Sequence, residues 1–225
     1  RLHALPAGLA EDRKLEDRSL DARVMRKQEA RAALKTELGI SETATLIVQI
    51  GSGFKVKGVD RALHAIASLP AEVRATLRYL LVGSGKPAAS LKLAKKLGIA
   101  AQVCIVGGRD DVPQLLAAAD LMLHPAYRES AGYTLLEAVV AGLPVLATET
   151  CGYAYHIRQA NAGVVCPEPF SQDTLNKLLA DTLGKLPTAD WSANDLAYGA
   201  DDSLYSMPQA AADFIQRFEN GTPRG

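Results

Sequence analysis

Residues 121–148, LMLHPAYRESAGYTLLEAVVAGLPVLAT, constrain the fold more than any other stretch of the sequence. The apolar run LMLHP stops at Pro125, which is typical of a buried parallel strand. Gly132 precedes a segment whose apolar residues recur at helical spacing, and the GLP that follows ends this helical pattern. A second apolar run, VLAT, comes next. The order strand, loop, helix, strand predicts a parallel βαβ unit.

The start of the helix in this unit is a candidate anion site. A helix that begins just beyond the carboxyl end of a strand leaves its first N–H groups unpaired and directs its positive dipole end toward the sheet edge, which suits a diphosphate. Glu129 precedes this helix start, and Glu137 on the second turn can reach back toward it. Carboxylates accept hydrogen bonds from sugar hydroxyls, so the pair fits a nucleotide sugar. The alternatives are a carboxylate that only complements the helix dipole and a solvated loop carboxylate.

The same alternation of strands and helices continues along the chain. It predicts an α/β fold with a doubly wound, Rossmann-like parallel sheet and a ligand at the carboxyl ends of the strands. Loops 51–58, 107–111 and 128–134 all follow predicted strands, so we expect them to converge on one pocket. A short strand is also predicted at residues 2–8. Helices are expected at 191–198 and 208–218, with Phe214 and Phe218 of the last helix exposed.

Composition limits the class of protein. The chain has 225 residues and is 48% hydrophobic, enough for one large α/β domain. Lys plus Arg equals Asp plus Glu at 25 each, so net charge gives no reason to expect nucleic acid or a strongly charged membrane surface. The three cysteines include no CxxC pair and are typical of reduced cytosolic thiols. No apolar run approaches the roughly 20 residues of a membrane span.

The two carboxylates carry a family resemblance. The E-x7-E pattern of Glu129 and Glu137, within HPAYRESAGYTLLEAVVAGLPVLAT, resembles the signature of family-4 retaining glycosyltransferases of the two-domain B type. HPAYRESAG followed by CGYAYHI is most similar to the members that add glucose to the heptose of the lipopolysaccharide inner core. The resemblance runs from about Leu5 to about Phe218. It covers only the carboxyl-terminal half of such an enzyme.

This resemblance implies that residues 1–225 form the domain that binds the donor UDP-glucose. It implies that the acceptor-binding, amino-terminal domain is absent from this chain, so the fragment alone should turn over little or nothing. The lipopolysaccharide core acceptor would be bound through that missing domain. The location expected is cytoplasmic, with peripheral association at the inner membrane left open for the full-length protein. No DxD pair is present to chelate a divalent ion, so neither a metal nor another cofactor is expected.

The resemblance also assigns roles to residues. Lys57 would clamp the leaving diphosphate and Glu129 the transferred sugar, and these two are the expected catalytic residues. Glu137 would hold the ribose and Arg109 would stack on the base. The donor-binding residues expected in this way are Arg13, Gly51, Ser52, Lys55, Lys57, Arg109, Glu129, Ala131, Gly132, Tyr133, Thr134 and Glu137.

The loop before Gly58 departs from the family pattern. Ser52 and Val56 stand where relatives carry an arginine, and Lys55 is the candidate to replace that charge. The alternative to a diphosphate-binding role for Lys57 is an ordinary loop lysine. The alternative to a donor-binding role for Arg13 is a charge exposed to solvent.

For several other reactive or charged residues, the sequence also allows a purely structural role. Arg109 has the alternative of a surface ion pair with Asp110 or Asp111, one of which is expected to cap the next helix. His124 is read as a strand-end residue that lines the cleft. Cys151 and His156 are read as a packed thiol and a polar surface histidine.

Two other functions remain open from the sequence. One is a noncatalytic sugar-nucleotide-binding module, because the expected acceptor domain is absent. The other is an NAD-dependent oxidoreductase, although no G-x-G-x-x-G opens a first helix with an acidic residue about 20 positions later. GSGKP at residues 83–87 lacks the remaining Walker residues and is read as a strand-end turn.

Overall fold

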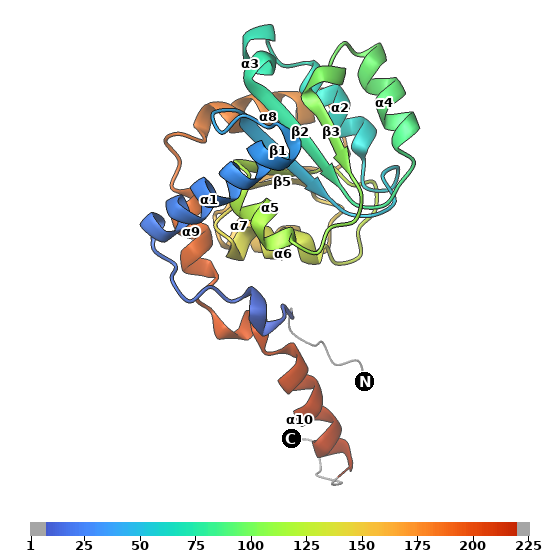
Figure 1. Cartoon of the computed structure of the whole chain (residues 1–225). Coiled ribbons are helices and arrows are strands. Elements are labelled where there is room, and N and C mark those ends of the chain that lie inside the picture. The colour runs from blue at the N-terminus through green and yellow to red at the C-terminus, as the bar shows by residue number, and fades with distance from the viewer. Residues whose placement is uncertain (1–7, 220–225) are drawn as a thin grey trace.

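Six parallel strands form a central sheet between two layers of helices (Figure 1). The structure is a computed structural model that describes residues 8–219. The strand order is β3-β2-β1-β4-β5-β6, which confirms the predicted doubly wound parallel sheet. The strands are β1 (Thr45–Ile50), β2 (Leu77–Val82), β3 (Val103–Val106), β4 (Leu121–His124), β5 (Val145–Thr148) and β6 (Gly163–Cys166).

Alternating strand side chains feed two separate cores, because successive residues of a strand point to opposite faces. One core contains Val48 and Met122, and the other contains Ile47 and Leu123. The first face is covered by α1 (Leu20–Leu38), α5 (Val112–Ala118), α6 (Tyr133–Val140) and α7 (Ala154–Gln159). The second is covered by α2 (Val59–Ala67), α4 (Pro87–Lys96) and α8 (Gln172–Lys185), with the short α3 (Ala71–Thr76) leading into β2.

The two ends of the described chain meet on the outer side of α6. Leu9 and Leu204 pack with Leu136 and Val140 of that helix in a small third core. α9 (Trp191–Tyr198) matches its predicted range and packs on α6, whereas α10 (Met207–Glu219) extends away from the sheet layers (Figure 1).

Two expectations for the chain ends have different outcomes. Phe214 on α10 is 39% exposed, as expected, but the side chain of Phe218 lies outside the described residues. The strand predicted at residues 2–8 also lies outside them, apart from Gly8, which is not in a strand. Between residues 8 and 219, no helix combines the length and apolarity needed to cross a bilayer.

The sheet reverses its winding between β1 and β4, and the loops that follow these strands touch. Gly58 has φ +69°, and a Cβ there would lie 1.9 Å from the carbonyl oxygen of Pro125. Only glycine fits this backbone approach. Tyr127 N–H donates to the Val56 carbonyl at 2.9 Å, so the two loops are also hydrogen-bonded.

A buried arginine connects α1 to the ends of α5 and α6 in the same layer of helices. Arg23 donates to the carbonyl oxygens of Gly142 (2.8 Å), Ala117 (3.1 Å) and Ala119 (3.4 Å). Nearby on α9, Asp195 is fully buried, and neither carboxylate oxygen has a hydrogen-bond partner in residues 8–219. Burial raises the pKa of Asp195 well above its usual value, against the opposing charge of Arg23.

Asp195→Asn should stabilise the chain, and more so as pH rises. A carboxyl with a raised folded-state pKa costs stability as pH rises from the unfolded pKa to the folded one, by about 1.4 kcal/mol per pH unit. Asparagine does not titrate, so the variant-minus-wild-type difference in free energy of unfolding should grow between pH 5 and pH 8. Urea unfolding at both pH values measures it, with the exposed Asp190→Asn as control. If the difference in free energy of unfolding does not change with pH, the raised pKa of Asp195 is contradicted.

Gly58→Ala should destabilise the chain by about 2–4 kcal/mol, because backbone strain at positive φ adds to a collision with backbone. Gly98→Ala is the matched control, since Gly98 has φ +72° and open space where its Cβ would stand. It should cost only about 1–2 kcal/mol. Thermal or urea unfolding of both variants separates strain from collision, and equal losses would show that the Gly58–Pro125 approach does not matter.

Candidate functional site

Lys57 and Glu129 form an ion pair at the point where the sheet reverses its winding. Lys57 Nζ contacts Glu129 Oε2, and the two side chains are only 21% and 14% exposed. The backbone of Lys57 is fixed from below, because Gln49 Nε2 donates to its carbonyl at 2.6 Å. Gln49 is in turn held by the hydroxyl of Tyr79, which donates to its Oε1 at 2.5 Å. The lysine and the carboxylate, 72 residues apart in sequence, are thus brought together as expected for one pocket.

The loop that carries Glu129 is joined to the loop after β5. Gly152 N–H donates to the Glu129 carbonyl at 3.1 Å, and Tyr153 N–H donates to the Ala131 carbonyl at 2.7 Å. A Cβ at Gly152 would lie 2.1 Å from the carbonyl oxygen of Ser130, so the loops approach backbone to backbone. Two backbone hydrogen bonds and this close approach hold Glu129 on a fixed frame.

Glu129 is ionised at every physiological pH. His124 Nε2 lies 3.4 Å from Glu129 Oε2. His124 and then Lys57 lower the pKa of Glu129 to about 2, against the opposing effect of burial. The group at this position is therefore a hydrogen-bond acceptor and not a proton donor.

α6 begins beside this carboxylate. Gly132 has φ +94° at the N-cap, and a Cβ there would lie 3.2 Å from Glu129 Cγ. No side chain among the described residues caps the helix, so the N–H groups of Tyr133 and Thr134 are not taken by a capping bond. An uncapped helix end next to Lys57 is suited to bind an anion.

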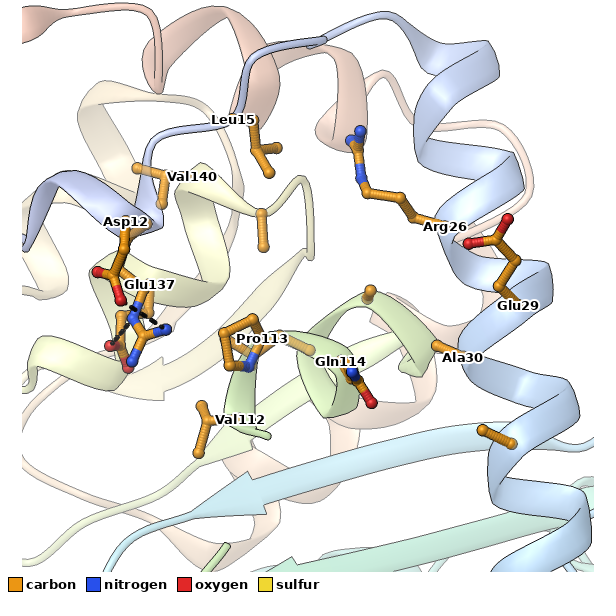
Figure 2. Close-up of a pocket in the computed structure, with 15 residues that line it drawn as sticks. Asp12, Leu15, Arg26, Glu29, Ala30, Val112, Pro113, Gln114, Glu137 and Val140 are labelled. Carbon is orange, nitrogen blue, oxygen red and sulfur yellow. Dashed lines mark hydrogen bonds and ion pairs between the residues drawn. The ribbon is translucent and has the colours of Figure 1, made fainter. Parts of the chain in front are cut away.

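Glu137, one turn further along α6, is paired with Arg13. Arg13 belongs to a 3-10 turn at Glu11–Arg13 and donates from Nε to Glu137 Oε1 at 3.1 Å (Figure 2). Burial raises the pKa of Glu137 above its usual value, and the Arg13 charge opposes the rise. The pair lies at one end of a cavity of about 420 Å³ between α1, α5 and α6. Val112 and Pro113 at the start of α5 line the same end (Figure 2).

Arg109 forms the ion pair that the sequence left open. It donates to both carboxylate oxygens of Asp111, at 2.8 and 2.7 Å, and also contacts both oxygens of Glu37 at the end of α1. These contacts raise the pKa of the guanidinium. Asp111 occupies the N-cap position of α5, but its side chain makes no capping bond because it is engaged by Arg109. The expected capping bond is therefore absent, and the partner Glu37 was not predicted.

The remaining predicted site residues are Gly51, Ser52 and Lys55, and not all of them lie at the Lys57–Glu129 ion pair. A Cβ at Gly51 would lie 3.4 Å from Lys57 Cε, so Gly51 borders the ion pair. Ser52 Oγ accepts from Ser84 N–H at 3.3 Å in the next loop. Lys55 is exposed and lines a separate hollow between α2 and α4. No hydrogen bond or ion pair among the described residues joins Lys55 to Glu129.

Two residues have surroundings that the sequence did not predict. Arg61 on α2 lies between the rings of Tyr127 and Phe170, at 3.6 and 3.5 Å from their centroids, and donates to the Ala126 carbonyl at 3.1 Å. It braces the loop after β4. Its signal in the sequence was weak, because neither ring is near it in the chain.

His156 is not the surface residue predicted. It is 3% exposed and contacts Tyr198 through Nδ1 at 2.7 Å, and burial lowers its pKa to about 4. Cys151 is a buried thiol, as predicted.

Comparison with known proteins identifies relatives along most of the chain. Residues 30–189 match the family model described as glycosyl transferases group 1. The lipopolysaccharide glucosyltransferase WaaG of Escherichia coli K12 is 45% identical over 216 residues, which are 96% of this chain and 56% of that protein.

Two solved structures have the same fold. The crystal structure of WaaG, a glycosyltransferase involved in lipopolysaccharide biosynthesis, aligns with TM-score 0.83 and 45% identity over 94% of this chain and 55% of its own. Anabaena HepE in complex with UDP-glucose aligns with TM-score 0.74 and 21% identity over 93% and 56%. The chain thus spans about half the length of these proteins. On the family match over 160 of its residues, this chain belongs to the glycosyl transferases group 1 family.

Proposed function

We propose that this chain is the donor-binding half of a retaining glycosyltransferase that transfers glucose from UDP-glucose to the heptose of the lipopolysaccharide inner core. The observation that carries the proposal is the Lys57–Glu129 pair beside the uncapped start of α6. The similarity to WaaG supports the substrate, since that relative is described as a lipopolysaccharide glucosyltransferase. The acceptor would be bound by an amino-terminal domain, and the enzyme would work in the cytoplasm.

In this proposal UDP-glucose takes over contacts that side chains of the site make with one another. The diphosphate takes Lys57 away from Glu129 and accepts hydrogen bonds from the N–H groups of Tyr133 and Thr134. Glu129 then accepts hydrogen bonds from the hydroxyls of the transferred sugar. As the bond between the sugar and the diphosphate breaks, Lys57 and the helix dipole stabilise the charge of the leaving group. These groups supply the positive charge without a metal ion.

The nucleoside would bind further along α6. Its ribose hydroxyls would donate hydrogen bonds to the Glu137 carboxylate, beside or in place of the hydrogen bond that Arg13 donates to it. The base would stack on the flat guanidinium of Arg109, whose other contacts hold it in one orientation. A noncatalytic sugar-nucleotide-binding module would use the same residues, so only an assay of transfer by the full-length protein separates the two functions.

Calorimetry with UDP-glucose tests the site on this chain. Lys57→Ala and Glu137→Ala should each weaken binding about tenfold or more, because each removes a charge-assisted contact worth about 1.5–3 kcal/mol. Lys96→Ala on exposed α4 is a matched control for loss of a lysine and should bind like the wild type. Equal affinity for all four proteins would overturn the site.

A further inference from the structure

We propose that His124 is a positioning residue, which holds the Glu129 carboxylate by one oxygen when Lys57 turns to the diphosphate of the donor. The contact itself belongs to the free chain. Its role in sugar binding rests on the function proposed above.

The geometry assigns the two oxygens of Glu129 to different partners. Lys57 Nζ and His124 Nε2 both face Oε2. No hydrogen bond or ion pair within residues 8–219 reaches Oε1. One oxygen is therefore held by the protein, and the other is available to accept a hydrogen bond from a ligand hydroxyl.

His124 is not the cleft-lining residue that the sequence predicted, because no part of its side chain is exposed. It ends β4, its side chain is fully buried, and neither ring nitrogen makes a hydrogen bond of good geometry in the described part of the chain. A buried polar ring without partners is costly, so its presence here needs an explanation. Among residues 8–219, the only carboxylate it faces at ion-pair distance is Glu129.

Charge balance explains why a second donor is needed. Lys57 cannot be directed fully at a diphosphate and at Glu129 at the same time. If Lys57 alone held Glu129, donor binding would leave a nearly buried carboxylate unpaired beside two phosphates, which repel it. An N–H from His124 would keep the carboxylate in place during this exchange.

A buried thiol near this cluster does not replace His124. Cys151, beyond β5, is buried, and its Sγ lies 3.7 Å from Thr148 Oγ1. Burial raises the pKa of this thiol, with the Glu129 charge acting in the same direction and Lys57 against it. It is a protonated, weak donor, so His124 is the stronger hydrogen-bond donor to Glu129.

The first test needs no ligand. Ring ¹⁵N correlation spectra of the chain at pH 7 report which imidazole nitrogens carry protons, and His124→Leu assigns the signal. We expect a proton on Nε2 of His124. A bare Nε2, with the proton on Nδ1 alone, would overturn the proposal, because a lone pair cannot donate to a carboxylate.

The second test is the ratio of dissociation constants for UDP-glucose and UDP, measured by calorimetry. His124→Leu should raise this ratio about tenfold, because misplaced Glu129 affects the sugar and not the nucleotide. His124→Gln, which keeps an N–H near the position of Nε2, should restore it. His64→Leu, on an exposed position of α2, is the control and should leave the ratio unchanged.

The outcomes separate this inference from the proposed function. If the wild type binds neither UDP nor UDP-glucose, the proposed function fails, while the ring spectra still decide the His124–Glu129 contact. If the wild type binds both and His124→Leu leaves the ratio unchanged, or weakens both ligands equally, the positioning role is wrong. If His124→Leu does not fold, His124→Gln assigns the ring signal in its place, and the ring tautomer of the wild type decides: a proton on Nε2 supports the proposal and a bare Nε2 overturns it.

Discussion

The close approach of Gly58 to the Pro125 carbonyl is the constraint on which the site depends. It fixes the loop after β1 against the loop after β4 at the point in the described sheet where adjacent parallel strands send their connections in opposite directions. Because Lys57 precedes this contact and Glu129 follows it, their side chains meet although 72 residues separate them. A side chain at position 58 would push the loops apart, and the ion pair would open.

Each of the three acidic groups predicted or found at the site is already paired with a cation. Glu129 faces Lys57, Glu137 faces Arg13, and Asp111 faces Arg109. In a partly buried site, an ion pair that loses one member leaves an expensive charge behind. An anionic ligand that takes Lys57 must therefore be accompanied by groups that satisfy the carboxylate it leaves. A sugar diphosphate carries both, because its phosphates attract the lysine and its hydroxyls donate to the carboxylate.

Sequence reasoning predicted the sheet well because buried parallel strands are short apolar runs with clear ends. It also placed Lys57 and Glu129 together, since loops at the carboxyl ends of parallel strands share an edge. It could not find the partner of Arg109 on α1 or the burial of His156, because both depend on how helices pack and not on local pattern. The short α3 was missed because its six residues carry no apolar periodicity that separates them from a loop.

The packing of α6 decides which parts of the site can respond to a ligand. Its two outward apolar residues, Leu136 and Val140, are covered by segments from both ends of the described chain, and its inner face is buried against the sheet. The turn that ends it is tied to α1 through Arg23 and the Gly142 carbonyl. A helix held on all these sides cannot shift without disturbing several cores. Ligand binding must therefore act through side chains with two available partners, and Lys57 and Arg13 are long cationic side chains of this kind.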